Sequence, residues 1–589
     1  MSTMEERTFN YVLIGGGTAG LAVAARLTED PTITVCVLEA GEDVTKQLDF
    51  TVPGFGFKNL GPSKVNWGLS TVPQVNAKDR SLYLPRGKAL GGSSMINLMT
   101  LGRGHEAEYN AFASLGSPGW DWKGMVEYFR LSETFAPTTE EISKFEVVFN
   151  AATHGTRGPL QRTLPTWISE LQAPVIRAMR SLGVPYNPDG ASGNNVGVWT
   201  SNHSIDTNGA RSSSASAYYE PNKSRTNLVV ITGAQATRVI FRSSKDASGN
   251  LIASAVEYSK DGQVLTVSTT EEVLLCAGAL KTPQLLELSG IGDEKVLKDK
   301  GVHLELNLPG VGANLQDHFW CLFVSETDSK YESVEVLNNP VRAAEEWKLY
   351  DESKRGMLSG IGSTLLTFLP KEYFMEGSDR VLPEQIRTSL YQRLENIQKG
   401  WLGEGVPFLE IGFVPGFLPI PGHKAEEGKS YCSFFLALTH PFSSGTVHIA
   451  SSDPFASPAI DHCVLDNELD IEILVHAIKF TRKLADTPDL SSVLTKEVIP
   501  GPEVQTDEEI KDFIRGSIDT VFHPIGTAAM LPREEGGVVG ASLKVYGTSN
   551  LRVVDASIIP IQLSAHIQAT VYAIAEKAAA IIKHERQHA

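Results

Sequence analysis

The chain opens with an alternation of apolar and glycine-rich segments. Residues 10–14 (NYVLI) form an apolar run that leads directly into residues 15–20 (GGGTAG), and residues 21–27 are rich in Ala and Leu. A second apolar run, residues 32–38 (TITVCVL), ends at Glu39. This order predicts a strand, a glycine turn, a helix and a second strand, which together make one βαβ unit.

Similar patterns predict further elements along the chain. A stretch dense in Gly, Pro and Ser occupies residues 41–104. After it, helical patterns occur over residues 106–133, 280–288, 341–349, 470–485 and 568–583. Strand-like runs occupy residues 227–240, 252–276, 408–413, 431–438, 445–450 and 551–557, with a turn signal at Asp261-Gly262. Because residues 331–520 mix both kinds of element without any dinucleotide signature, we interpret them as a second, substrate-covering domain.

The first glycine segment has the spacing of a dinucleotide-binding turn. In the pattern formed by Gly15, Gly17 and Gly20, the first glycine makes the turn, the second admits a pyrophosphate, and the third lets the helix pack closely. Glu39 follows the second strand, near the separation of ~20 residues expected for an acid that binds ribose hydroxyls and repels a 2′-phosphate. The strand–turn–helix context disfavours the alternative, a glycine turn without a ligand. The segment therefore suits FAD or NAD better than NADP.

Length and charge limit the class of protein. The chain has 589 residues, of which 42% are hydrophobic and 21% charged, so two or more globular domains are expected. Its net charge of −17 disfavours nucleic acid and anionic membranes as partners. The oligomeric state is left open by the sequence.

The cysteines and the N-terminus add two expectations. The five cysteines are odd in number, far apart and without a C-x-x-C pair, so neither a disulfide framework nor a metal site is expected. No apolar run is long enough to span a membrane, and the start MSTMEERTFN lacks a secretory pattern. We therefore expect a cytoplasmic protein.

Four further segments resemble the glucose-methanol-choline (GMC) oxidoreductase family. They are residues 85–94 (PRGKALGGSS) with Asn97, residues 276–286 (CAGALKTPQLL) with 289–292, residues 308–318 (LPGVGANLQDH), and a C-terminal group made of 523–527 (HPIGT), 555–557, His566 and 568–570. With the first glycine segment they follow the family's order from residue 10 to about residue 585. The chain is similar to the aryl-alcohol oxidases and choline dehydrogenases of this family.

The resemblance implies a two-domain architecture. An α/β, Rossmann-like FAD-binding domain would be assembled from residues 1–160, 225–330 and 521–589. An α+β substrate-binding domain with an antiparallel sheet would be made of residues 161–224 and 331–520.

The resemblance also implies which residues hold FAD. Near the first glycine turn they are Gly15, Gly17, Thr18, Ala19, Gly20, Glu39 and Ala40. In the second glycine loop they are Arg86, Gly91, Gly92, Ser93, Asn97, Leu98 and Met99. The others are Ala236, Ala277, Gly278, Asp555, Ala556, Ile567 and Gln568. Some members attach FAD to a histidine just before the asparagine of the second loop; Ile96 stands there, so non-covalent FAD is expected.

His523 is the candidate catalytic base. An alcohol gives up a hydride only if its hydroxyl proton leaves as well, and histidine has a pKa suited to accept that proton. His523 matches the family's histidine before Pro524, and His566 would make a second polar contact to the substrate oxygen. Because two adjacent imidazolium ions repel, one of the two should stay neutral. We interpret the pair Asp317-His318 as structural.

A predicted helix start and several aromatic residues are further candidates for the site. The last helix would begin near Gln568, with its N-terminus directed at the flavin, where it would stabilise negative charge. Phe522, Phe434, Phe435 and Trp401 are candidates for the wall of a pocket for an apolar or aryl alcohol, although such aromatic residues are more often simply core.

The sequence therefore predicts FAD-dependent oxidation of a primary or secondary alcohol to a carbonyl compound, with aryl and specialised-metabolite alcohols among the candidates. O2 or a quinone-like acceptor would reoxidise the flavin. Two alternatives use the same fold: a hydroxynitrile lyase that keeps FAD without redox chemistry, and a light-driven decarboxylase. The presence of both His523 and His566 favours alcohol oxidation.

Overall fold

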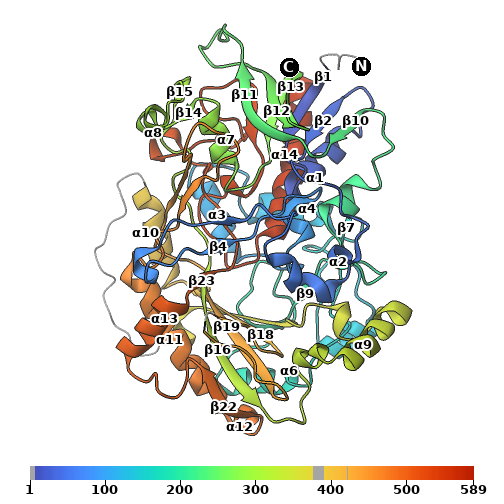
Figure 1. The fold of residues 1–589 in the computed structure, drawn as a ribbon, viewed down its shortest axis with the longest axis vertical. Coiled ribbons are helices and arrows are strands. Elements are labelled where there is room, and N and C mark those ends of the chain that lie inside the picture. Colours follow the sequence, from blue (N-terminus) through green and yellow to red (C-terminus); the bar gives the residue numbers. More distant parts are fainter. Residues whose placement is uncertain (1–6, 376–390, 421, 589) are drawn as a thin grey trace.

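The computed structural model describes residues 7–375, 391–420 and 422–588, which form two large sheets and five two-stranded ones, with helices around them (Figure 1). The first sheet, in the upper half of Figure 1, has the strand order β10-β2-β1-β13-β12-β11, with β24 paired to β13. Its strands are β1 (Thr8–Ile14), β2 (Val35–Leu38), β10 (Leu228–Ile231), β11 (Gln235–Phe241), β12 (Ala253–Lys260), β13 (Gln263–Leu275) and β24 (Leu551–Val553). The pairs among β10, β2, β1, β13 and β24 are parallel, and β11 and β12 extend the sheet in antiparallel fashion.

The predicted βαβ unit is confirmed. β1 leads through the glycine turn into α1 (Thr18–Leu27), and every residue of β2 is buried, as expected for a continuous apolar run inside a parallel sheet. The predicted turn between β12 and β13 is also present. Asp261 and Gly262 both have positive φ (51° and 75°), which a two-residue hairpin turn requires.

The second sheet lies in the lower half of Figure 1 and is antiparallel throughout. Its strands, in the order β17-β18-β19-β16-β22 with β23 beside β16, are β16 (Phe319–Thr327), β17 (Leu365–Leu369), β18 (Leu409–Val414), β19 (Ser430–Leu438), β22 (Leu494–Ile499) and β23 (Asp519–Thr520). Helices α11 (Glu468–Ala485) and α13 (Asp507–Ser517) pack beside it. The expected α/β fold with a second, antiparallel sheet is therefore confirmed.

The C-terminal helix returns to the first sheet. α14 (Gln568–His588) packs against α1 and α4 (Trp122–Ser132). The single helical segment predicted over 106–133 is two helices, α3 (Glu106–Ser114) and α4, because Gly116 and Gly119 between them adopt positive φ (108° and 81°). Further helices are α5 (Thr139–Phe145), α6 (Gln172–Ser181), α7 (Thr282–Leu288), α9 (Pro340–Ser353) and α10 (Gln392–Trp401).

The predicted division into two domains stays a prediction, and residues 1–6, 376–390, 421 and 589 of those domains lie outside the described residues. One strand falls on the other side of the predicted boundary at residue 330. β16 lies in the segment that we assigned to the FAD-binding domain, but it pairs with β19 and β22 in the antiparallel sheet. Nearly all of β16 is buried, so its sequence carries no alternation that would show which sheet it joins.

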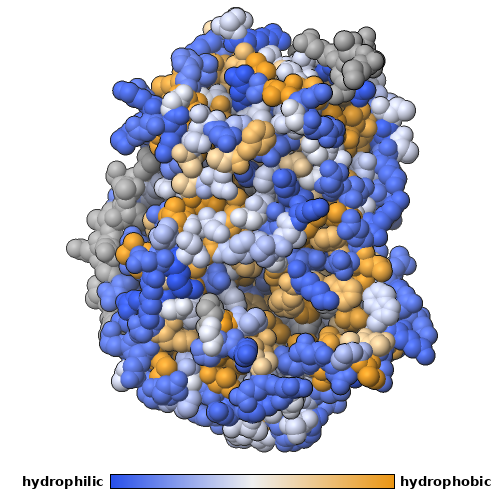
Figure 2. All heavy atoms as spheres, in the orientation of Figure 1, coloured by the Kyte–Doolittle hydropathy of each residue, from blue (hydrophilic) through white to orange (hydrophobic). Residues whose placement is uncertain are grey.

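The surface shows a mixture of polar and apolar residues, and the apolar ones gather around a hollow in the lower half of the view (Figure 2). Among the helices of the described residues, none is long and apolar enough to cross a membrane. All five cysteines are free thiols, and four of them are buried, where they act as small core residues.

Candidate active site

A cavity of about 480 Å³ is lined by residues of both sheets. The predicted site residues that line it are Gly15, Gly17, Thr18, Ala19, Glu39, Ala40, Arg86, Gly92, Ser93, Asn97, Leu98, Met99, Ala236, Ala277, Gly278, His523, Asp555, Ala556, His566, Ile567 and Gln568. Gly20 and Gly91 do not line it. The structure therefore gathers residues from the whole length of the chain around one space.

The first glycine turn has the form that the spacing predicts. Gly15 has φ of 108°, and a Cβ there would lie 2.4 Å from the carbonyl oxygen of Cys276. A Cβ on Gly20 would lie 2.0 Å from the carbonyl oxygen of Gly15, so only glycine lets the helix approach the turn. Gly17 differs, because the nearest atom to its Cβ position is the Cα of Gly92 at 3.8 Å. A side chain at Gly17 would extend into the cavity, in the space that a pyrophosphate would need.

Glu39 lies at the end of β2 with its carboxylate fixed by the backbone. The N–H of Gly16 donates to Oε2 at 2.9 Å, and the N–H of Gly41 donates to Oε1 at 2.7 Å. Burial raises the pKa of this carboxyl to about 7, although the two backbone donors act in the opposite direction. Each oxygen keeps a second lone pair, so a ribose hydroxyl can still bind there.

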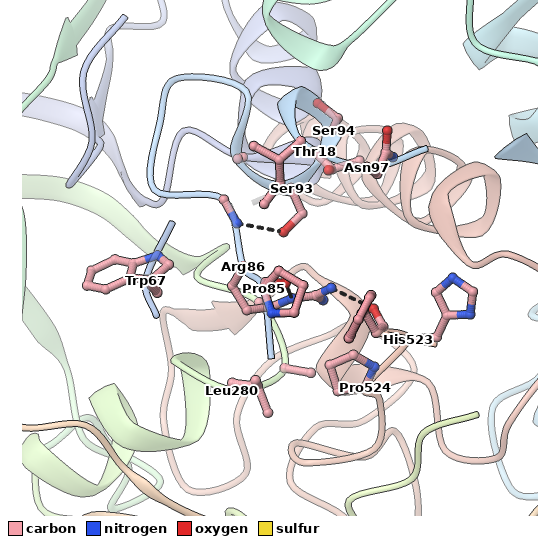
Figure 3. Close-up of a pocket in the computed structure, with 18 of the residues that line it drawn as sticks. Thr18, Trp67, Pro85, Arg86, Ser93, Ser94, Asn97, Leu280, His523 and Pro524 are labelled. Atoms are coloured by element: carbon pink, nitrogen blue, oxygen red, sulfur yellow. Dashed lines mark hydrogen bonds between the residues drawn. The ribbon is translucent and has the colours of Figure 1, made fainter. Parts of the chain in front are cut away.

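Arg86 links the second glycine loop to the loop that carries His523. Its Nη2 donates to the carbonyl oxygen of Phe522 at 2.6 Å, and the N–H of Gly87 donates to Ser93 Oγ at 3.2 Å (Figure 3). Burial lowers the pKa of Arg86 to about 10. Gly91, with φ of 99°, shapes this loop from behind the cavity wall.

The start of α14 faces the cavity. Asn97 Nδ2 donates to Gln568 Oε1 at 2.7 Å, and Arg211 Nη1 donates to Asn97 Oδ1 at 2.8 Å. Within the described part of the chain, the buried Nε2 of Gln568 has no hydrogen-bond partner. Gln568 is the first residue of α14 and lines the cavity, and the free backbone N–H groups of a helix N-terminus fit a ligand with acceptor atoms, such as a flavin ring.

Asp555 closes the same side of the cavity. Its Oδ2 accepts from the N–H of Gly278 at 2.9 Å and from Thr282 Oγ1 at 2.6 Å, and its Oδ1 accepts from the N–H of Ser557 at 2.8 Å. Burial raises the pKa of this carboxyl above its ordinary value. These bonds join the loop after β24 to the segment that follows β13.

His523 lines the cavity, and contacts with Asp317 and His318 hold it in place. Its backbone N–H donates to Asp317 Oδ1 at 2.7 Å, and its ring Nδ1 lies 2.9 Å from Nδ1 of His318. Its ring also meets that of His566 edge to face, with 5.1 Å between ring centres. Burial holds the pKa of His523 well below its ordinary range, and the nearby His318, His566 and Arg86 act in the same direction. His523 is therefore a neutral imidazole at pH 7.

His566 lies beside a buried carboxyl. Its Nε2 is 3.5 Å from Oε1 of Glu410 on β18, and among the described residues its Nδ1 has no hydrogen-bond partner. Burial lowers the pKa of His566 to about 3 and raises the pKa of Glu410 to about 8. Although the distance is that of an ion pair, burial favours the neutral form of both groups, so we interpret the contact as one between neutral groups.

Apolar side chains of the second sheet form the opposite wall. Trp320, Leu366, Val414 and Phe435 line the cavity together with Phe522. Phe522 and Phe435 thus lie where a pocket wall was expected. Phe434 and Trp401 do not line the cavity and are buried in the core, so that expectation was wrong for these two residues.

Two polar residues of this region were missed as functional candidates. Glu410 falls in a run that is apolar otherwise, and a lone carboxyl in a buried strand was a signal that could have identified it. His318 was interpreted as structural, yet it contacts the ring of His523 directly. The motif that contains His318 can be recognised in the sequence, but nothing in the sequence indicates that its ring contacts His523.

Comparisons with known proteins agree with this geometry. Sequence models described as GMC oxidoreductase match residues 9–320 and 441–575. The GMC oxidoreductase family protein Mala s 12 of Malassezia sympodialis is 34% identical, over 98% of this chain and 93% of that protein. An alcohol dehydrogenase (acceptor) of Pseudomonas putida is 33% identical, over 98% of this chain and 95% of that protein.

Solved structures give the same result. An FAD-dependent oxidoreductase from Chaetomium thermophilum has a TM-score of 0.88 with 29% identity, over 98% of this chain and 100% of that one. A fungal aryl-alcohol oxidase has a TM-score of 0.86 with 29% identity, over 99% of this chain and 100% of that one. The similarity covers both sheets and the cavity between them.

Proposed function

Because this chain belongs to the GMC oxidoreductase family and binds FAD, we propose that it oxidises a primary or secondary alcohol to the carbonyl compound, with His523 as the base. The observation that carries the proposal is the neutral ring of His523 in the cavity, beside His566 and opposite an apolar wall. Ile96, at the position of the covalent attachment in some relatives, has no atom that could bond to the cofactor, so FAD is non-covalent.

The residues that line the cavity would have separate roles in binding and in proton transfer. FAD, when bound, supplies the acceptor for the hydride that leaves the alcohol carbon. Gly17, Glu39 and Gln568 would hold its phosphate, ribose and ring portions. His523 accepts the hydroxyl proton on its ring, since burial keeps that ring neutral. His566, which also lines the cavity, would make the second polar contact to the substrate oxygen.

The wall favours an apolar alcohol. Trp320, Leu366, Val414 and Phe435 offer no charged group to a substrate, so a cationic or strongly polar alcohol would lose hydration without compensation. An aryl or other planar apolar alcohol would instead bury its surface against the aromatic rings. The fungal aryl-alcohol oxidase and the bacterial alcohol dehydrogenase among the relatives support this choice. O2 or a quinone-like compound would take the electrons from the flavin.

Anaerobic flavin reduction tests the proposal. The yellow protein is mixed with a panel of alcohols without oxygen, and bleaching of the flavin absorbance is followed before air is admitted. Apolar primary alcohols should bleach the flavin, and His523→Ala should slow bleaching by about 10²- to 10⁴-fold with FAD still bound. The control is His303→Ala, whose side chain is exposed and should behave as wild type. Near-native bleaching by His523→Ala would refute the assigned base. Cyanide release from a cyanohydrin, without bleaching by any alcohol, would indicate a lyase.

A further inference from the structure

Three imidazole rings lie in a row beside the cavity. His318 Nδ1 is 2.9 Å from His523 Nδ1, and the rings of His523 and His566 meet edge to face. The other nitrogen of His318, Nε2, lies 2.8 Å from the carbonyl oxygen of Leu563. His318 is fully buried, so no solvent competes for these bonds.

The carbonyl oxygen of Leu563, next to the outermost ring of His318, determines which ring nitrogens carry a hydrogen. A carbonyl oxygen only accepts, so the Nε2 of His318 must carry a hydrogen. Burial lowers the pKa of His318 to about 4, so this ring is neutral and its Nδ1 holds a lone pair. The contact between the two Nδ1 atoms then requires a hydrogen on Nδ1 of His523. The Nε2 of His523 is left with a lone pair, and it is the ring nitrogen available to the cavity.

The backbone holds this arrangement in place. Asp317 Oδ1 accepts from the backbone N–H of His318 at 2.8 Å and of His523 at 2.7 Å, although 206 positions separate Asp317 from His523. Asp317 Oδ2 accepts from Thr520 Oγ1 at 2.8 Å. One buried carboxylate thus anchors both rings, so the distance between them is set by main-chain contacts as well as by the ring bond.

We propose that His318 is a positioning residue, which holds His523 in the tautomer whose Nε2 lone pair faces the substrate hydroxyl. This proposal rests on the proposed function and adds a residue to it. In the other tautomer, Nε2 of His523 would carry a hydrogen and could not take the hydroxyl proton. When Nε2 accepts that proton, the Nδ1–H of His523 still donates to His318, so the positive charge forms against an oriented acceptor.

Two variants separate positioning from packing. In His318→Asn, the side-chain oxygen can take the place of Nδ1 and accept from His523, while the bond to Leu563 is lost. In His318→Leu, the space is filled but no acceptor is left. The rate of flavin reduction at saturating alcohol should fall about 10- to 100-fold in His318→Leu, with little change in KM, and the asparagine variant should recover most of it.

The ring tautomer is measured directly and without substrate. In FAD-loaded protein labelled with ¹⁵N-histidine, wild type should show His523 with a protonated Nδ1 and an unprotonated Nε2, because the two states have well-separated ¹⁵N shifts. The leucine variant should show a mixture of tautomers. FAD absorbance and the unfolding midpoint report whether each variant is folded.

The outcomes are distinct. If no alcohol reduces the wild-type flavin, the proposed function fails, while the ¹⁵N spectrum still decides the tautomer. A protonated Nε2 on His523 in wild type would overturn the inference. So would equal rates for folded His318→Asn and His318→Leu, since packing alone would then explain His318.

Discussion

Glu410→Gln should make the stability of this protein less dependent on pH. Glu410 is fully buried on β18, and within the described part of the chain neither carboxyl oxygen has a hydrogen-bond partner. Burial raises its pKa from 4.5 to about 8, so the folded protein binds a proton that the unfolded chain has already released between those values. A raised pKa gives a contribution to stability that is fully present below about pH 4.5 and is lost as the pH rises to about 8.

The size of the effect follows from the same linkage. Across that pH window the free energy of unfolding of the wild type falls by on the order of 1 kcal/mol per pH unit, or on the order of 2 kcal/mol between about pH 5.5 and about pH 7.5. Glutamine has nearly the same shape and no proton to lose, so the variant lacks this slope. The buried histidines have lowered pKa values and contribute a slope of the opposite sign, but they are common to both proteins and cancel in the difference.

Urea unfolding of FAD-saturated protein at three pH values provides the assay. The free energy of unfolding of the variant minus that of wild type should grow more positive as the pH rises. The control is Glu257→Gln on β12, since the hydrogen bond from Arg238 lowers the pKa of Glu257 and the group is ionised in both states across this range. A constant difference for Glu410→Gln, as expected for the control, would show that Glu410 is ionised in the folded protein and that the neutral contact with His566 is wrong.

Four further outcomes are expected. Gly92→Ala should weaken FAD binding by about tenfold or more, measured as flavin absorbance after dialysis, since φ is +53° and the new Cβ would lie 2.7 Å from the first glycine turn. Glu133→Gln should lower the free energy of unfolding in urea by about 3–5 kcal/mol, because it leaves two buried arginines short of a partner. Gly412→Ala should change the order of preferred alcohols in the bleaching assay, since its Cβ would lie 1.8 Å from the ring of Phe435, which must move. In Glu410→Gln, which lacks the group beside His566 with a pKa of about 8, flavin reduction should be independent of pH above about 6.5 and slow only in acid, because the lowered pKa of His523 keeps it neutral; a rise between about pH 7 and about pH 9 in this variant would contradict this.

The sequence predicted those parts of the fold that depend on local pattern. The order of β1, glycine turn, α1 and β2 follows from neighbouring residues, because the turn needs a glycine with positive φ and the buried strands need apolar runs. The break between α3 and α4 was also encoded locally, in Gly116 and Gly119, and a stricter use of these residues would have placed it.

The rest of the site depended on long-range partners. The strand predicted over 431–438 is buried on both faces, so its period gave no way to decide that Phe435 faces the cavity while Phe434 faces the core. His318 and His523 are 205 positions apart, and the pairing of β16 with β23 and the bonds to Asp317 bring their rings together. Motifs identified His523 as the candidate base, but a motif does not show which nitrogen of its ring is free.

The low basicity of His523 constrains how the reaction runs. An alcohol hydroxyl, like that of water, has a pKa of about 16, and the imidazole pKa is held well below its ordinary range. Complete proton transfer before the C–H bond breaks would therefore cross a gap of at least roughly ten pKa units, which is about 14 kcal/mol. A turnover of about 10 s⁻¹ allows a total barrier of about 16 kcal/mol, so almost nothing would be left for breaking the C–H bond. In the proposed reaction, the proton would therefore move to Nε2 of His523 as the hydride leaves. This timing requires the lone pair of that nitrogen to be aimed at the hydroxyl before the reaction starts, which is the condition that His318 and the carbonyl of Leu563 impose on the ring.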